Sequence, residues 1–175
     1  MARRMEHTIA FDAPAEKIYA DFTSREYWQT LMEAYRQISP ESQSTVTSFT
    51  SDERGTDIVF VQVMPRSELP PIARTVMPVD MVVTRAQHFD PYDCANNRAE
   101  GTYSASVPHG PGRFGGQYLL TDTGTGTGSR LRLASVCKVY LPFVGGALED
   151  LILNNIKYLF HAEEAFTADW IAEHH

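Results

Sequence analysis

The C-terminal part of the sequence contains one segment long enough to dominate the fold. Between Gly146 and Glu173 there is no proline and no further glycine. Apolar residues recur there at the three- and four-residue spacing of an amphipathic helix; they are Leu148, Leu151, Ile152, Leu159, Phe166 and Trp170. At about 1.5 Å per residue, such a helix is roughly 40 Å long. A chain of 175 residues can bury so long a stripe only if a broad second layer wraps around it.

The residues that precede this helix predict that the second layer is a β-sheet. Residues 5–11 alternate as a first strand, and two short segments with aromatic faces at helical spacing follow. Asp12 and a capping box that begins at Thr23 are the predicted starts of these two helices. Beyond residue 42 the period becomes two, which predicts six further strands, at residues 42–50, 56–64, 79–89, 95–107, 113–122 and 129–141. The predicted class is therefore α+β.

Two features interrupt the strand pattern. Residues 65–78 contain four prolines, so this segment is either a crossover loop or a short amphipathic helix that acts as a flap over an opening. Gly101 and the pair Gly115 and Gly116 lie inside predicted strands, where glycine often marks a bulge or a sharp bend. A sheet bent at these glycines can curl around the C-terminal helix.

Composition argues against several classes of partner. The formal net charge is −7, from 15 basic and 22 acidic residues, whereas nucleic-acid binding requires clustered Lys and Arg. No apolar run approaches the roughly 20 residues of a membrane span, so membrane insertion is not predicted. The N-terminal sequence MARRM is followed by polar residues, which does not match a signal peptide.

The cysteines and histidines predict neither a disulfide nor a metal site. Cys94 and Cys137 form no close-spaced motif, which is typical of reduced thiols and indicates a cytoplasmic protein. The six histidines form no H-x-H or H-E-x-x-H pair, and no dinucleotide or phosphate-binding loop is present, so no metal and no other cofactor is predicted. The length predicts a single domain over residues 1–175. The oligomeric state, and whether His174 and His175 are native, have no sequence signal.

Two stretches resemble the START-like superfamily, also called SRPBCC, of the birch-pollen-allergen type. IAFDAPAEKIYADFTSREYW, residues 9–28, is similar to the opening strand, Ala-Pro turn and helix pair of that superfamily. LPFVGGALEDLILNNIKYLFHAEEAFTADWIAE, residues 141–173, resembles the end of a branch of unknown function that is common in high-GC bacteria. The first match indicates only the fold, and the second carries over no catalytic residue.

The resemblance implies a helix-grip fold, in which a curved seven-stranded antiparallel sheet wraps around the long C-terminal helix. Two short helices follow the first strand in this fold. Members of the superfamily bind lipids, sterols, polyketides or other hydrophobic molecules between sheet and helix. A minority catalyse cyclisation, dehydration or hydrolysis. A small hydrophobic ligand is therefore the expected partner.

Helical projection and strand alternation select the candidate ligand-binding residues, although a one-residue slip of a strand would reverse its faces. The candidates are Phe60, Met64, Tyr103, Tyr118, Leu133, Ile152, Asn155, Leu159 and Glu163. Asn155 and Glu163 are the polar exceptions on the helical face; they either pair with structural partners or orient the polar end of a ligand. Phe166 and Trp170 are predicted to pack on the short helices, against Phe22, Trp28, Leu31 and Tyr35.

Three functions fit these observations. The favoured one is binding of a lipid-like or polyketide-like molecule in a cavity between the sheet and the C-terminal helix. The first alternative is an enzyme of the polyketide cyclase or dehydratase type, which requires at least two titratable groups to converge on the cavity, for instance Glu163 with His88 or Tyr103. His88 is the one acid–base candidate among the histidines, because His161 is predicted to point into solvent. The second alternative is a scaffold with a filled core and no ligand.

Overall fold

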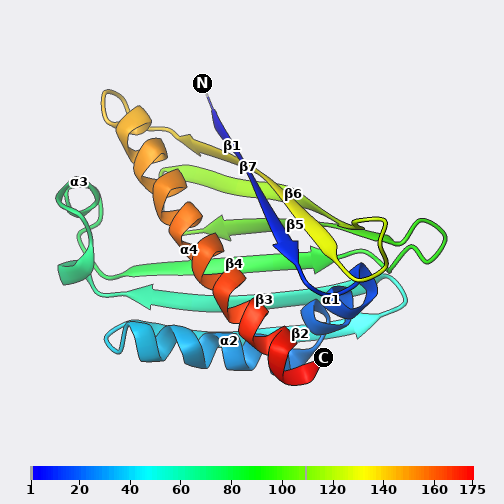
Figure 1. Ribbon diagram of the computed structural model, residues 1–175. Coiled ribbons are helices and arrows are strands. Elements are labelled where there is room, and N and C mark those ends of the chain that lie inside the picture. The colour runs from blue at the N-terminus through cyan, green and yellow to red at the C-terminus, as the bar shows by residue number, and fades with distance from the viewer. Residues whose placement is uncertain (1, 109) are drawn as a thin grey trace.

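The computed structural model describes residues 2–108 and 110–175 and has the helix-grip architecture (Figure 1). The strands in the described ranges form one antiparallel sheet of seven, in the order β1-β7-β6-β5-β4-β3-β2. Their bounds are β1 Arg3–Phe11, β2 Gln43–Asp52, β3 Gly55–Met64, β4 Met81–Phe89, β5 Arg98–Ser106, β6 Gly112–Asp122 and β7 Ser129–Val139. The helices are α1 Ala15–Phe22, α2 Arg25–Ile38, α3 Pro71–Arg74 and α4 Gly145–His174. The predicted order of elements is confirmed.

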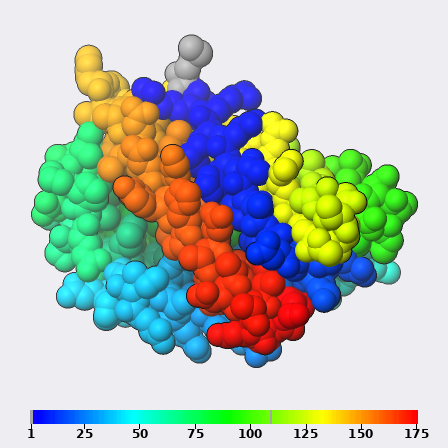
Figure 2. Space-filling view, in the orientation of Figure 1, coloured from blue at the N-terminus to red at the C-terminus, as the bar shows by residue number. Residues whose placement is uncertain are grey.

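Helix α4 crosses the inner face of the curved sheet. It runs along the front of the molecule in Figure 2, with β1 on one side and α2 and the region of α3 on the other. Its main packing partners in the sheet are β7 and β1. None of the helices in the part of the chain that the structure describes is long and apolar enough to cross a membrane.

The strand glycines mark no bulge, so that alternative is wrong, while a sharp bend at them stays a prediction. Pairing is continuous through Gly101 and Gly116, and the register shift lies in β2 between Val46 and Ser48. The glycines instead make room for two rings. A Cβ at Gly101 would collide with the phenol of Tyr118, and one at Gly116 would collide with the phenol of Tyr103.

The helix starts also differ from the prediction. The backbone N–H of Ala15, at the start of α1, donates to Oδ1 of Asp122 at 2.7 Å, so a residue of β6 caps this helix rather than Asp12. Ser24 precedes α2 without a side-chain cap, and the Thr23 hydroxyl donates to a carbonyl of the preceding helix. A cap supplied by a distant strand leaves no local signal in the sequence.

The proline-rich segment forms one short 3₁₀ turn, Arg66–Glu68, followed by the short helix α3. Leu69 is buried between them. Ile72 and Val76 pack on a small cluster that contains Leu148 of α4 and Val139 of β7. The segment therefore covers one end of the space between sheet and helix, and its movement as a flap stays a prediction.

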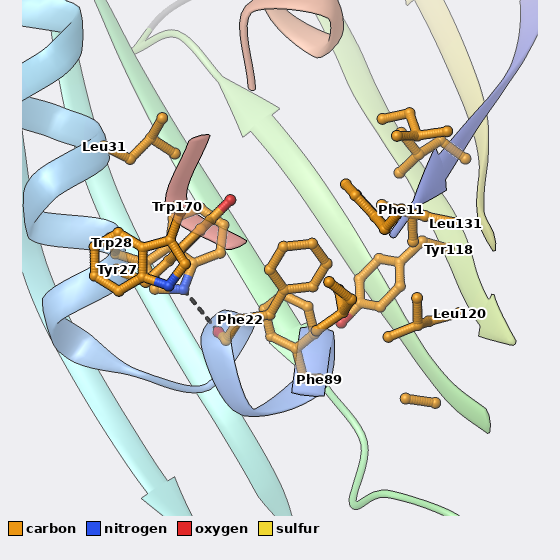
Figure 3. Packing of buried hydrophobic residues seen from close by; sticks show 14 of the residues in the cluster. Phe11, Phe22, Tyr27, Trp28, Leu31, Phe89, Tyr118, Leu120, Leu131 and Trp170 are labelled. Atoms are coloured by element: carbon orange, nitrogen blue, oxygen red, sulfur yellow. Dashed lines mark hydrogen bonds between the residues drawn. The ribbon is translucent and has the colours of Figure 1, made fainter. Parts of the chain in front are cut away.

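Aromatic side chains from the short helices, the sheet and α4 form the core (Figure 3). The predicted packing of the C-terminal residues on the short helices is confirmed, with Tyr27 as the central ring: its centroid lies 5.4 Å from Phe166 and 5.5 Å from Trp170. The indole N–H of Trp170 donates to Asp21 of α1 at 3.1 Å. These contacts anchor the C-terminal end of α4 on the short helices.

Candidate functional site

A cavity of about 50 Å³ lies between the inner face of the sheet and α4. Its wall is mostly aromatic and aliphatic, with a few polar side chains from β4 and α4. The lining residues are Ile9, Phe11, Phe22, Tyr27, Trp28, Arg85, Gln87, Phe89, Tyr103, Tyr118, Leu131, Leu133, Phe160, Glu163, Glu164 and Thr167. A volume of this size holds a few water molecules at most, since one water needs on the order of 10–15 Å³.

Arg85 and Glu163 form an ion pair on the wall of this cavity. Nη1 of Arg85 lies 3.1 Å from Oε1 of Glu163, and the two side chains are only 8% and 17% exposed. The same carboxylate oxygen accepts a 2.6 Å hydrogen bond from the Tyr35 hydroxyl of α2. Glu163 therefore joins three elements: α4, β4 and α2.

The position of Arg85 follows from the alternation of β4. Arg85 and Phe89 are buried, and Gln87 between them lines the cavity, so this part of the strand turns its odd-numbered residues inward. The Arg85 guanidinium lies 4.6 Å from the centroid of the Phe60 ring, a cation–π contact. Sequence reasoning missed Arg85. The sequence feature that could have revealed it is a single cation at an inward-facing position of an otherwise apolar strand.

Burial changes the proton affinities of these groups in opposite senses. Burial by itself lowers the pKa of Arg85, but the neighbouring carboxylate of Glu163 and the Tyr35 hydroxyl offset this and raise that pKa overall. The pKa of Tyr35 is well above its usual value, first because of burial and then because of the charge of Glu163. The wall of the cavity therefore carries a permanent cation at Arg85, and the Tyr35 phenol behind Glu163 keeps its proton.

Two tyrosines present their rings to the cavity and direct their hydroxyls into the sheet. The Tyr103 hydroxyl lies 2.6 Å from Oγ of Ser135, and the Tyr118 hydroxyl donates to the carbonyl of His88 at 2.9 Å. Burial is the main cause that raises the pKa of each phenol. Their rings thus act as apolar wall, whereas the polar contacts of the cavity come from Arg85 and Glu163.

Comparison with known proteins assigns the chain to a family. Residues 6–171 match the sequence family described as "Protein of unknown function (DUF2505)". The chain belongs to the DUF2505 family. Uncharacterized proteins of Mycobacterium bovis and of Mycobacterium tuberculosis strain H37Rv are each 24% identical to it over 172 residues, which is 98% of both chains.

Solved structures show that this DUF2505 chain has the START-like fold. Ara h 8.0201 superposes with a TM-score of 0.56 at 11% identity, over 99% of both chains. Norcoclaurine synthase from Thalictrum flavum gives 0.54 at 15% identity, over 99% of this chain and 88% of that one. A START superfamily protein from Mycobacterium smegmatis gives 0.51 at 18% identity, over 96% and 98%. The resemblance seen in the sequence is confirmed at the level of the fold.

The structure of the DUF2505 chain brings four of the nine predicted site residues to the cavity. They are Tyr103, Tyr118, Leu133 and Glu163. Phe60 is fully buried beneath Arg85 and beside the Trp28 ring, outside the lining. The other four also lie outside the lining: Met64, Ile152 and Leu159 are partly buried, and Asn155 is exposed.

The inner face of α4 differs from the predicted one by about one residue. The predicted face contained Ile152, Asn155 and Leu159, whereas the structure buries residues one position later in the chain; they are Leu153, Ile156 and Phe160. Apolar residues occur at 151, 152 and 153 in succession, so periodicity alone does not fix the rotation of the helix about its axis. Asn155 is consequently exposed and does not line the cavity.

Two catalytic pairs were predicted for Glu163. Tyr103 and Glu163 both line the cavity, but His88 does not meet Glu163, so the pair with His88 is wrong. His88 lies on the outer face of the sheet, where its Nδ1 is 2.8 Å from Asp57 and its Nε2 is 3.0 Å from Asp90. The hydrogen bond to Asp57 is the main cause that raises the pKa of His88. Alternation of β4 explains the placement, because His88 is one residue removed from the inward-facing Gln87.

Proposed function

We propose that this DUF2505 protein binds a small amphipathic molecule, lipid-like or polyketide-like, between the sheet and α4. The apolar body of the ligand contacts the rings of Tyr103 and Tyr118, and its polar group binds at Arg85 and Glu163. One observation carries the proposal: a buried ion pair faces a cavity whose wall is otherwise aromatic and aliphatic. An apolar pocket with a few convergent polar groups is the usual form of a small-molecule site.

Stability alone does not account for the ion pair. Removing two charges from water costs several kcal/mol per ion, and the attraction within a buried pair repays this cost only when every remaining donor and acceptor is satisfied. Glu163 accepts one N–H from Nη1 of Arg85, which leaves further guanidinium donors that face Tyr35 and the cavity. A ligand oxygen can accept from them.

The small volume sets a requirement on binding. Drug-sized ligands occupy pockets of roughly 300–1,000 Å³, whereas this cavity measures about 50 Å³. The ligand must therefore displace water and separate part of α4 from the sheet. The helix meets the inner face of the sheet through side chains, so it can shift as a rigid element. Each Å² of apolar surface that the ligand buries contributes about 25 cal/mol.

The test is retention of a ligand by the native protein. Native mass spectrometry of untagged protein purified without denaturation is expected to show a co-purified adduct, and titration with anilinonaphthalene sulfonate is expected to show saturable binding. Leu133→Trp fills the cavity and removes both signals. Leu159→Trp is the matched control, because this helix residue lies outside the lining.

Each outcome of this test bears on the proposal. Phe160→Ala enlarges the cavity and is expected to increase binding of the dye, while near-ultraviolet circular dichroism shows whether each variant keeps its packed aromatic core. Equal binding by wild type and Leu133→Trp, or no binding by wild type and Phe160→Ala, would overturn the proposal and favour a scaffold without a ligand.

A second candidate function is acid–base catalysis on the bound molecule. The contact of Tyr35 with Glu163 favours it, because two titratable groups meet at a charged guanidinium on the cavity wall. The co-purified molecule, re-added to ligand-free protein, would change mass with wild type and not with Glu163→Gln. Cyclisation without loss of water conserves mass, so chromatographic retention is compared as well; if mass and retention both stay unchanged, binding alone is favoured. We also propose that the protein is cytoplasmic, which agrees with Cys94 and Cys137 both being free thiols.

A further inference from the structure

Three side chains with metal-binding atoms meet at the rim where β1 passes α4. They are His7 of β1 and His161 and Glu164 of α4, and one ligand atom from each lies within 4.8 Å of the other two. Nδ1 of His161 is 3.7 Å from Oε2 of Glu164. The rings of His7 and His161 meet edge to face, with centroids 4.9 Å apart. Two elements that are distant in the sequence thus place two imidazoles and one carboxylate together.

His7 has a buried polar atom with no partner among the described residues. Its Nε2 is buried and makes no hydrogen bond to any residue that the structure describes. Its ring stacks on Phe160 at 5.7 Å between centroids, which holds the imidazole in place. An unpaired buried nitrogen is unfavourable, because it has lost its hydrogen bonds to water and gained none in the protein. A bound metal ion would give this nitrogen the partner that it lacks.

We propose that His7, His161 and Glu164 bind one divalent transition-metal ion, with Zn²⁺ as the best match. Two histidines and one carboxylate form a known three-ligand zinc set that keeps a fourth position open. Bond lengths of about 2.0–2.2 Å in a tetrahedral site separate ligand atoms by roughly 3.4 Å. The three side chains therefore need to close by about 1 Å, and the two on α4 are partly exposed and free to do so.

The charges near His7 act on a bound cation in opposite senses. Glu164 belongs to the cluster itself, and Lys157 lies close enough to act on His7. The positive charge of Lys157 weakens cation binding, whereas the charge of Glu164 strengthens it.

The metal site adjoins the proposed ligand cavity without depending on it. Glu164 belongs to both, because it also lines the cavity. His7 pairs across the sheet with Leu133, another lining residue. An ion bound here would hold its open position at the rim of the cavity, within reach of a polar ligand group or a water molecule. Metal binding can be measured with no ligand present, so the two proposals can fail separately.

The test is calorimetric titration of untagged, chelator-treated full-length protein with Zn²⁺. We expect one ion per chain, and at least a tenfold weaker Kd in each of His7→Gln, His161→Gln and Glu164→Gln. His161 and Glu164 are partly exposed, so these two variants are expected to remain folded. His88→Gln is the matched control, since His88 also contacts carboxylates but lies elsewhere, and its Kd should equal that of wild type.

Two further measurements separate the site from other metal-binding groups. Co²⁺ in place of Zn²⁺ should give a visible spectrum without a thiolate charge-transfer band, which excludes Cys94 and Cys137 as ligands. The double variant His174→Asn and His175→Asn should bind as wild type does. The proposal is wrong if wild type shows no saturable binding, if the three site variants bind as tightly as wild type, or if the C-terminal double variant loses the ion.

Discussion

Oε1 of Glu163 lies 3.1 Å from Nη1 of Arg85 and accepts a 2.6 Å hydrogen bond from Tyr35. One carboxylate oxygen therefore links the long helix both to the centre of the sheet and to the helix that covers its edge. This contact places a charged group of α4 in the middle of the fold.

Glu163→Gln is expected to destabilise the protein by about 3 kcal/mol, because it leaves the buried Arg85 cation without its counter-charge. The free energy of unfolding in urea measures the loss. Glu33→Gln is the control: Glu33 pairs with Arg36 at 4.0 Å on the exposed surface of α2, where such a pair contributes at most about 0.5 kcal/mol. Losses of equal size in the two variants would contradict the role given to the buried pair.

The neighbouring glycines of β6 are expected to differ in their tolerance of alanine. A Cβ at Gly116 collides with the Tyr103 phenol and with the carbonyl of Ala134, whereas the nearest atom to a Cβ at Gly115 lies 3.2 Å away. Gly116→Ala should therefore cost about 2 kcal/mol through forced displacement of the ring and backbone. Gly115→Ala should cost less than about 1 kcal/mol, since alanine suits an extended chain better than glycine does. Thermal unfolding compares the two, and the reverse order would refute the packing described for Tyr103.

The stability of the protein should depend on the protonation of His88. Its pKa is raised in the folded state above the ordinary value of 6.5, first by the hydrogen bond to Asp57. The stabilisation is therefore fully present below about pH 6.5 and is lost as the pH rises through the folded-state pKa. Accordingly, the difference in unfolding free energy between wild type and His88→Gln should shrink from about pH 6 to about pH 9.

NMR titration of the His88 ring measures the same effect directly. Asp57→Asn removes the main cause of the raised His88 pKa, so this pKa should move down towards 6.5. The contact with Asp90 at 3.0 Å should keep the pKa partly raised. A His88 pKa that does not respond to Asp57→Asn would show that the contact does not persist in solution.

The limits of sequence reasoning are clearest at α4. Its existence and extent were predictable, because the absence of proline and the run of helix-forming residues are local properties. Its rotation was not, because Leu151, Ile152 and Leu153 offer competing faces and only the sheet decides among them. Four of the nine candidate residues reach the cavity, and the error in rotation removed Ile152, Asn155 and Leu159. Arg85 was missed, since nothing near it in the chain reveals a partner on another element.

The amino-acid sequence by itself determined the order of helices and strands, with strand ends within three residues of those observed, because periodicity, glycine and proline act over a few neighbouring residues. The tertiary structure alone decided which side chains meet. Glu163 with Arg85, Asp122 with the start of α1, and His7 with His161 are contacts between segments far apart in the chain. Such contacts depend on the curvature of the sheet and the rotation of α4, and both result from packing over the whole molecule.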